Sequence, residues 1–343
     1  MAENALWIVS VPLDSSPEEQ LEELKPVLEG KGEAVTFDFP QFKTGTLSSL
    51  LSLSDALTKH DPTITSTLSK LIDTIRSLTS GPSPDGQSDR SSPLSAHLVI
   101  DDGRPYFDYL FPEGGEGKGW QWNLAKYRVE SRSLQEVVEG LVKETASIEN
   151  AQRNKSQGYA LVKGQLVTAL RKKTGNLSMR SLADVVSEED FAGTNESEYL
   201  ETVLVAVPKN LVKEWETSYE RLTSMVVPRS STKLASDDDF VLFGCAIFRK
   251  VHDEFAQKCR ENKFILRDFT YDADAIEAGK KELASLQVQE KELWSDLLRL
   301  SRINFSELFQ ILVHLKVIRA YVESVLRYGL PAVYFSTIIK APH

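Results

Sequence analysis

Two long stretches of the chain carry apolar residues at heptad spacing, and they lie far apart in the sequence. The first runs from Leu134 to Ala169 and the second from Ile276 to Leu300. Apolar residues that recur every seven positions are typical of helices that pair along their length. Because the chain leaves along one stretch and returns along the other, the two helices must run antiparallel. The sequence therefore predicts a two-helix neck.

Both apolar seams become polar near their middle. Lys155 interrupts the first seam, close to Gln152, and Glu290 interrupts the second. Opposite charges on facing helices help to fix which helices pair and in what register. We therefore expect Lys155 and Glu290 to lie on facing surfaces near the centre of the neck. The alternative, in which both side chains are simply solvated, stays open.

The segment between the two helices, residues 172–272, has the pattern of a small α+β domain. Stretches rich in β-branched and aromatic residues predict strands, and stretches with helical periodicity lie between them. The expected strands are 202–208, 238–248 and 264–272, and the expected helices are 211–222 and 249–263. This segment is therefore expected to form a head domain at the far end of the neck.

The two ends of the chain are expected to form one further domain, the foot. The helix predicted at 304–328 is apolar over most of its circumference, which is typical of a helix at the centre of a core. Because the neck returns the chain to its starting end, this helix should pack against the N-terminal elements. Those are predicted strands at 6–11, 34–39 and 120–129, and predicted helices at 17–30, 46–61 and 67–78.

A definite corner follows that apolar helix. Gly329 is the residue type that most easily ends a helix, and Pro331 prevents the helix from resuming. The next stretch, "AVYFSTII", has the composition of a strand, which either docks onto elements made earlier or lacks its partner.

The expected fold class is α+β and elongated, with two lobes, a foot and a head, joined by a long antiparallel two-helix neck. The predicted boundaries are 1–128 for the N-terminal part of the foot, 129–171 for the first neck helix, 172–272 for the head, 273–302 for the second neck helix and 303–343 for the C-terminal part of the foot.

Composition and charge limit the classes of function. The net charge of -10 disfavours a general nucleic-acid binder, which needs a basic face. The two cysteines, Cys245 and Cys259, lack metal-ligand spacing and are expected to be reduced thiols in a cytosolic protein. The longest apolar stretch, 308–318, is too short to span a bilayer, and the N-terminus lacks the basic region of a signal peptide. Any association with a membrane is therefore expected to come through partners.

No set of residues has the spacing of a catalytic, cofactor or metal site. The loop 114–119, "GGEGKG", lacks the first glycine and the Ser or Thr of a phosphate-binding P-loop. The five histidines are scattered, and His314 is expected to be a hydrogen-bonded member of its helix. Three carboxylates at 237–239 indicate a solvated turn, with a cation site as the open alternative. We therefore predict no catalytic residue, no cofactor and no metal.

Six ordered blocks in the second half of the chain carry a specific family resemblance. The blocks are "GNLSMRSLADVV" (175–186), "EYLETVLVAVPK" (198–209), "YERLTSMVVPRSS" (219–231), "RENKFILRDFTYD" (260–272), "NFSELF" (304–309) and "VESVLRYGLP" (322–331). With these blocks the chain resembles the C subunit of the V-type proton-pumping ATPase, from about residue 6 to residue 331.

The resemblance implies a non-catalytic peripheral stator component of this rotary pump. Such a protein bridges the V1 and Vo sectors at the cytoplasmic surface of vacuolar and other endomembranes, and its release accompanies their regulated separation. The implied partners are the E and G subunits at the head and foot and, at the foot, the N-terminal cytoplasmic part of the a subunit. Some family members bind actin or nucleotide, so actin is a candidate partner. An unrelated helical scaffold, such as an actin-binding cytoskeletal protein, stays open as the alternative.

The resemblance does not indicate which residues form the interfaces. We select four basic side chains of the head, because they could meet an acidic partner helix: Arg180, Arg229, Lys233 and Arg249. Two departures from the family pattern are expected to matter. Family members continue past residue 331 with a further helix and a tyrosine-rich tail, which predicts that final elements are missing here. Residues 81–119 look lengthened, as in a surface insertion.

Overall fold

The computed structural model describes residues 6–29, 32–80, 93–101, 103–111, 120–191, 194 and 197–340. The chain divides into two compact units: unit 1 comprises residues 1–158 and 293–343, and unit 2 comprises residues 159–292. Helices occur together with antiparallel sheets, so the predicted α+β class is confirmed. The finer boundaries of foot, neck and head stay a prediction.

Two long helices each contribute residues to both units. They are α4 (Leu134–Thr174) and α7 (Ala273–Tyr328). The other elements of unit 1 are β1 (Leu6–Pro12), α1 (Pro17–Leu28), β2 (Glu33–Thr36), α2 (Leu47–Thr79), β3 (Val99–Ile100), β4 (Arg104–Pro105), α3 (Tyr106–Leu110) and β9 (Tyr334–Lys340). Those of unit 2 are β5 (Leu200–Pro208), α5 (Val212–Ser218), β6 (Thr232–Ser236), β7 (Phe240–Phe248), α6 (His252–Glu261) and β8 (Ile265–Arg267).

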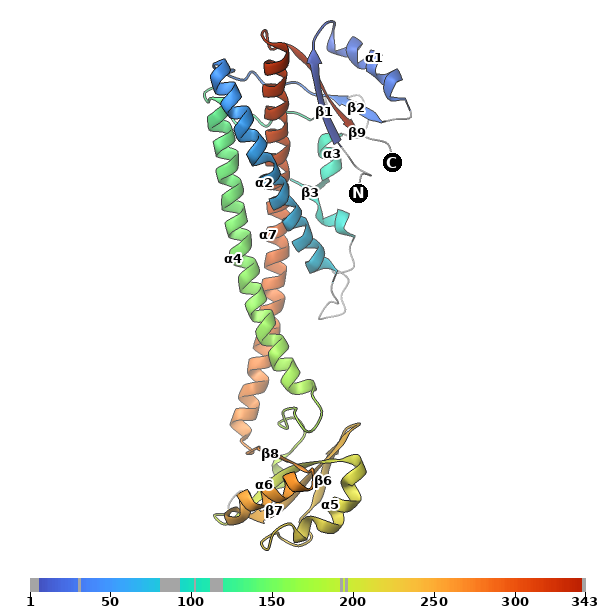
Figure 1. Ribbon diagram of the computed structural model, residues 1–343, viewed down its shortest axis with the longest axis vertical. Helices are drawn as coiled ribbons and strands as arrows, with labels where there is room; N and C mark the ends of the chain where they lie inside the picture. Colours follow the sequence, from blue (N-terminus) through green and yellow to red (C-terminus); the bar gives the residue numbers. More distant parts are fainter. Residues whose placement is uncertain are drawn as a thin grey trace. The chain divides into compact units, whose positions relative to one another are not determined.

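The two ends of the chain meet in a three-stranded sheet with the order β1-β9-β2 (Figure 1). β9 pairs antiparallel with β1, from Leu6 opposite Lys340 to Pro12 opposite Tyr334, and with β2 on its other side. Gly329 ends α7 at a φ of 83°, in the left-handed region that glycine reaches without strain. The strand after the predicted corner therefore docks onto elements from the start of the chain.

Unit 1 has a hydrophobic core around the C-terminal part of α7. Ile311, Leu315, Ile318 and Val322 of this helix are fully buried, and side chains from α2, α4 and the sheet pack against them. Figure 1 shows α7 running alongside α2 and α4 in this unit. The prediction that this helix is central to a core formed by both chain ends is confirmed.

Three expectations about individual elements are wrong. Residues 120–129 form turns and irregular structure instead of a strand, because their aromatic side chains are buried without pairing their backbone to a ladder. The helices expected at 46–61 and 67–78 are one helix, α2, which continues through Pro62. The helices expected at 273–302 and 304–328 are also one helix, α7.

A buried carboxylate links α2 to α7 in unit 1. Asp61 accepts hydrogen bonds from Lys316 Nζ at 2.8 Å and from Arg319 Nη1 at 2.7 Å. Burial alone would raise the pKa of Asp61, but the hydrogen bonds and positive charges of these two residues outweigh it and lower the pKa. Arg319 also pairs with Glu323, at 2.7 Å. The cluster therefore fixes one helix against the other through a charged contact.

We expect Asp61→Asn to lower the free energy of unfolding by about 2–3 kcal/mol, because two cations lose their carboxylate. The full cost of a broken buried pair is not expected, since Lys316 and Arg319 keep 42% and 38% of their side-chain surface in solvent. Urea unfolding measures the effect. Asp73→Asn is the matched control on the same helix, because Asp73 pairs with Arg76 at the surface, and it should cost less than about 0.5 kcal/mol.

The contribution of Asp61 to the free energy of unfolding should decrease at low pH. Because the folded-state pKa of Asp61 lies below its unfolded value, the contribution is present above a pH of about 3.9 and is lost as the pH falls through the folded-state pKa. Equal losses for the Asp61 and Asp73 variants at neutral pH would contradict the assigned role of the buried cluster.

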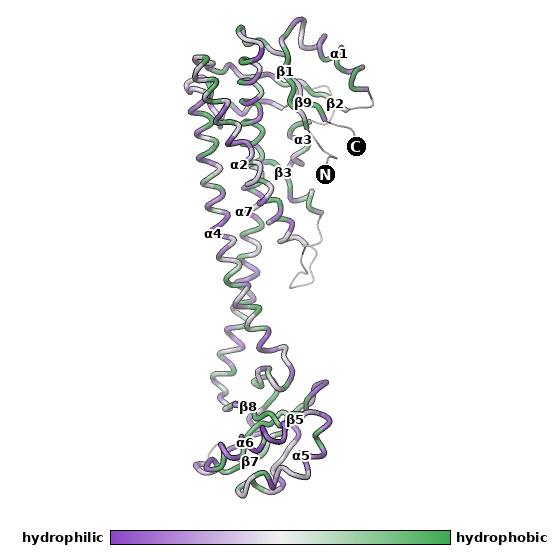
Figure 2. Tube along the Cα trace, in the orientation of Figure 1, coloured by the Kyte–Doolittle hydropathy of each residue, from purple (hydrophilic) through white to green (hydrophobic). Residues whose placement is uncertain are grey.

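Unit 2 is built on a four-stranded antiparallel sheet with the order β6-β7-β5-β8. Alternate residues of β5 face opposite sides: Val203 and Val205 join the core beneath α5 and α6, whereas Leu204 and Ala206 join a core formed with residues 177–191. In Figure 2 hydrophobic colour gathers on the strands of this sheet, while α5 and α6 are largely hydrophilic. Because successive side chains of a strand point to opposite faces, β5 contributes to both cores, and the sheet is covered on both faces.

Candidate functional site

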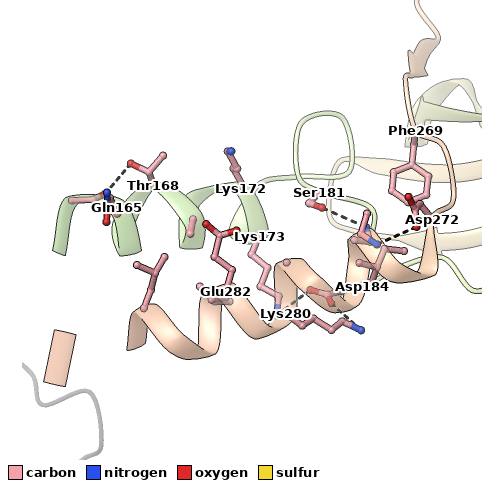
Figure 3. A pocket seen from close by; sticks show the side chains of 18 of the residues that line it. Gln165, Thr168, Lys172, Lys173, Ser181, Asp184, Phe269, Asp272, Lys280 and Glu282 are labelled. Carbon is pink, nitrogen blue, oxygen red and sulfur yellow. Dashed lines mark hydrogen bonds and ion pairs between the residues drawn. The ribbon is translucent and has the colours of Figure 1, made fainter. Parts of the chain in front are cut away.

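A groove lies between α4 and α7 in unit 2, as shown in Figure 3. Its volume is about 980 Å³. Small residues of both helices line much of it, namely Ala160, Gly164, Ala169, Ala275 and Gly279. Because these residues have little or no side chain, facing helices cannot fill the space between them.

Polar contacts hold both ends of this groove. At one end the Tyr159 hydroxyl donates a hydrogen bond to Glu290 Oε1 at 2.9 Å. At the other end Asp184 forms two ion pairs, with Lys173 Nζ of α4 at 3.0 Å and with Lys280 Nζ of α7 at 3.6 Å. One carboxylate between two ammonium groups therefore ties the helix ends to the loop that carries Asp184 (Figure 3).

The chemistry of the groove is that of a structural contact. The ammonium groups of Lys173 and Lys280 both contact the Asp184 carboxylate, which holds them in place within the protein. Lys172 and Glu282 also line the groove, and the described residues include no ion pair for either. The arrangement suits the locking of two helix ends.

Lys155 and Glu290 each have a partner of their own. Lys155 Nζ lies 3.5 Å from Asp296 Oδ2, and both side chains are about half exposed. Glu290 is buried and accepts the hydrogen bond from Tyr159. The predicted juxtaposition of Lys155 with Glu290 stays a prediction, and these two contacts were not foreseen from the sequence.

The polar interruption at Gln152 has a structural explanation. Gln152 Nε2 donates to Ser301 Oγ at 2.8 Å, and Asn304 Nδ2 donates to Gln152 Oε1 at 2.9 Å. Ser301 Oγ in turn donates to the Leu297 carbonyl at 2.7 Å. A satisfied polar network of this kind specifies the register of two packed helices in unit 1, since a slip would leave buried polar groups unpaired.

The four basic candidates lie on different segments of unit 2. The Arg180 carbonyl accepts from Arg267 Nη2 at 2.7 Å, and the Arg180 side chain is half-buried. Arg229 is exposed, and its backbone N–H donates to Glu220 Oε1 at 2.9 Å. Lys233 is exposed on β6. Arg249 follows β7, and its Nε donates to the Leu200 carbonyl at 3.3 Å.

One of the four, Arg249, belongs to an exposed patch at the end of the sheet. The patch comprises Tyr199, Met225, Phe248 and Arg249. Backbone bonds bring these residues together: Arg249 N–H donates to the Tyr199 carbonyl at 2.9 Å, and Phe248 N–H donates to the Met225 carbonyl at 3.1 Å. The aromatic side chains are unusually open, with Tyr199 71% exposed and Phe248 40% exposed. Aromatic residues, Met and Arg are the types enriched in protein–protein interfaces.

Sequence reasoning missed three residues of this patch. Phe248 ends an apolar strand, and its type does not distinguish it from the buried residues that precede it. The available signal was the combination of Tyr, Phe and Arg at strand ends, where side chains are less often enclosed by a core.

His314 is a structural residue, as the sequence predicted. Its Nδ1–H donates to the Gln310 carbonyl at 2.6 Å, and the Asn123 N–H donates to its Nε2 at 3.2 Å, which requires the neutral ring. Burial lowers the pKa of His314 to about 4; the hydrogen bond to Gln310 opposes this shift and the charge of Lys126 adds to it. Three aromatic rings enclose the imidazole, those of Trp120, Trp122 and Tyr127.

The carboxylates at 237–239 form a turn. Asp237 accepts backbone hydrogen bonds from Leu177, Asp239 and Phe240, at 2.5, 2.9 and 2.6 Å. Among the described residues no cluster of His, Cys, Asp and Glu has the arrangement of a metal site. The loop 114–119 lies outside the described residues. No helix within the described ranges is long and apolar enough to cross a membrane.

Known proteins resemble this chain along almost its whole length. A family model that describes the C subunit of the V-ATPase matches residues 6–343. The V-type proton ATPase C subunit from Caenorhabditis briggsae is 37% identical over 334 residues, which is 97% of this chain and 82% of that protein. Form 1 of the V-type proton ATPase C subunit from Xenopus tropicalis is 36% identical over 340 residues, which is 98% of this chain and 84% of that protein.

Among the solved structures that align with the chain is that of the cytoplasmic N-terminal domain of the I subunit of a V-ATPase, a homolog of the a subunit. The alignment covers 98% of this chain and 92% of that chain, with 14% sequence identity and a TM-score of 0.37. A likeness this weak carries no argument about fold or partner.

Proposed function

Because the chain belongs to the C-subunit family of the V-ATPase, we propose that it works as a non-catalytic peripheral subunit that bridges the V1 and Vo sectors of the proton pump and takes part in their reversible assembly. The match to the family over residues 6–343 carries this proposal. The exposed aromatic patch of unit 2 supports it, since it offers a partner a contact surface. The protein would act at the cytoplasmic surface of vacuolar and other endomembranes.

The proposal includes an elongated arrangement with a foot, a two-helix neck and a head. A rotary pump needs struts that resist torque between its sectors, and a molecule with one contact surface at each end supplies such a strut. The head would bind a heterodimer of the E and G subunits. The foot would contact a second such heterodimer and the N-terminal cytoplasmic part of the a subunit. Interfaces with charged components can be strong enough to hold and still be released under regulation.

We place the contact of the head with the E and G subunits at the patch of Tyr199, Met225, Phe248 and Arg249. Its exposed rings would bury apolar surface when the partner binds, and the Arg249 guanidinium would pair with a carboxylate of the partner. Arg180, Arg229 and Lys233 remain candidates for contacts outside this patch. The net charge of -10 makes such basic positions the favourable points for an acidic partner helix.

Phe248→Ala and Tyr199→Ala should each weaken binding of the E–G heterodimer by about tenfold or more, because centrally placed aromatic side chains carry most of the energy of an interface. Isothermal titration calorimetry with the purified heterodimer measures the affinity. Val288→Ala is the matched control, an exposed apolar side chain of the same unit on α7, and it should change the affinity by less than about twofold.

Two results would count against this function. Undiminished affinity in both aromatic variants would remove the patch from the interface. Failure of the unaltered protein to bind the heterodimer, together with co-sedimentation with actin filaments, would favour the cytoskeletal scaffold instead.

A further inference from the structure

A turn of unit 2 holds an arginine in a backbone conformation that its side chain disfavours. Arg229 has a φ of 58°, in the left-handed region, and follows Pro228. After the proline of a turn, a residue with positive φ is usually glycine or asparagine. An arginine there lowers stability, because its Cβ lies too close to the following carbonyl oxygen. The surrounding structure must therefore hold the turn in place.

Hydrogen bonds fix this turn on both sides of Arg229. The Arg229 N–H donates to Glu220 Oε1 at 2.9 Å. Ser230 Oγ donates to the Val227 carbonyl at 2.6 Å and accepts from the Ala246 N–H of β7 at 3.1 Å. A residue in a disfavoured conformation persists only where its surroundings impose that conformation, and such residues are concentrated at functional sites. The built turn therefore directs attention to the side chain that it carries.

The Arg229 guanidinium has no partner within the described residues. The side chain is exposed, and the structure records neither an ion pair nor a hydrogen bond for it there. Glu220 is engaged by the Arg229 N–H and by the Tyr219 hydroxyl, which donates at 2.9 Å. These two bonds lower the pKa of Glu220, and the nearby charges of Arg229 and Arg221 add to the shift. Two guanidinium groups near one carboxylate leave a positive charge available to a partner.

The turn also adjoins the exposed patch of Tyr199, Met225, Phe248 and Arg249. Val227 N–H donates to the Ala246 carbonyl at 3.0 Å, and Phe248 N–H donates to the Met225 carbonyl at 3.1 Å, so residues 225–227 lie along the end of β7. Arg229 comes two residues later, which is at most about 7 Å along the chain. A partner that covers the patch therefore lies within reach of the Arg229 side chain.

We propose that Arg229 is a specificity-determining residue of the head interface and that its guanidinium pairs with a carboxylate of the E–G heterodimer. Arginine and a carboxylate can form two parallel hydrogen bonds, which give the contact a fixed geometry. Glycine would fit the turn better, so what the arginine contributes is its side chain. The inference rests on the proposed function for the identity of the partner.

Arg229→Gly separates the role of the side chain from that of the fold. Glycine reaches a positive φ without strain, so the variant should unfold at a urea concentration no lower than that of the unaltered protein. Its affinity for the purified heterodimer, measured by isothermal titration calorimetry, should nevertheless fall about tenfold. A purely structural arginine would give the opposite pattern, a loss of stability.

Three further variants serve as controls. Arg229→Asn should match the glycine variant, because asparagine also tolerates a positive φ. Arg229→Lys keeps the charge without the planar fork, so its affinity should lie between those of the glycine variant and the unaltered protein. Arg260→Ala removes an exposed arginine of α6 that has no ion pair among the described residues, and it should change the affinity by less than about twofold.

A double-mutant cycle identifies the carboxylate. Each acidic residue of the heterodimer is replaced by its amide, and each variant is titrated with the unaltered chain and with Arg229→Gly. One of these amide variants should weaken binding to the unaltered chain by about tenfold and should cause little further loss against Arg229→Gly.

Other outcomes would overturn the proposal in distinguishable ways. Full affinity of Arg229→Gly, with weakened binding by Phe248→Ala, would refute the arginine contact and leave the proposed function standing. A lower unfolding midpoint of Arg229→Gly would assign the arginine to the fold. Self-association of the unaltered chain that Arg229→Gly abolishes would assign the guanidinium to a second copy. Failure of the unaltered chain to bind the heterodimer would refute the proposed function and this pairing with it.

Discussion

Trp215→Ala should lower the free energy of unfolding of unit 2 by about 3–5 kcal/mol, the range for removing a large buried aromatic side chain. Trp215 is fully buried beneath the sheet. Its ring lies 5.2 Å from that of Phe264, and its Nε1 donates to Ser231 Oγ at 3.0 Å. The variant therefore loses apolar burial and one hydrogen bond, and it leaves a cavity between α5 and the strands.

Hydrogen exchange of the β5 and β7 amides measures this loss where it occurs. Trp7→Ala is the matched control, since Trp7 is 61% exposed on β1, and it should cost less than about 1 kcal/mol. If the two tryptophan variants changed the exchange of β5 and β7 equally, the assignment of Trp215 as the anchor of this core would be wrong.

The second large effect is an expected loss of stability of unit 1 at mildly acidic pH. The folded-state pKa of His314 is about 4, and the unfolded value is about 6.5. Folding thus favours the neutral ring: its contribution is complete above pH 6.5 and is lost as the pH falls towards 4. The expected loss is about 2 kcal/mol between pH 7 and pH 5, and about 3 kcal/mol in total.

Urea unfolding at pH 7 and pH 5, followed by tryptophan fluorescence, measures this loss. His314→Asn removes the titrating group while keeping a donor for the Gln310 carbonyl. The variant should be less stable than the wild type at pH 7 and should lose less of its stability between the two pH values. Identical pH dependence in the two proteins would assign the acid sensitivity to other groups.

The sequence predicted most elements, because their signals are local. Ser16 caps α1 by accepting the Glu19 N–H at 3.2 Å, and glycine ends α7 at position 329. The continuity of α7 could also have been predicted, since no Gly or Pro occurs from Lys280 to Tyr328. β6 was missed because "TKLAS" is short and half polar, and its place in the sheet comes from pairing with β7.

Contacts between distant segments were harder to predict than elements. The aromatic residues at 120–129 resemble those of a strand, yet their type reflects burial around His314 and not ladder pairing. The ion-pair partner of Lys155 depends on the register of the two helices, and a heptad pattern predicts that register only to within one helical turn. The partner in the structure is Asp296. The exposed patch around Phe248 could not be read from composition, because exposure depends on what the rest of the fold leaves uncovered.

The pairing of β1 with β9 also bears on how the chain is made. A ribosome adds about 5–20 residues per second, so β1 waits on the order of tens of seconds before its neighbour in the ladder emerges. Unit 2, whose residues are contiguous, can fold during that time. Until then the apolar start of the nascent chain stays open to chaperones, and a slowed ribosome near the last codons would prolong that exposure.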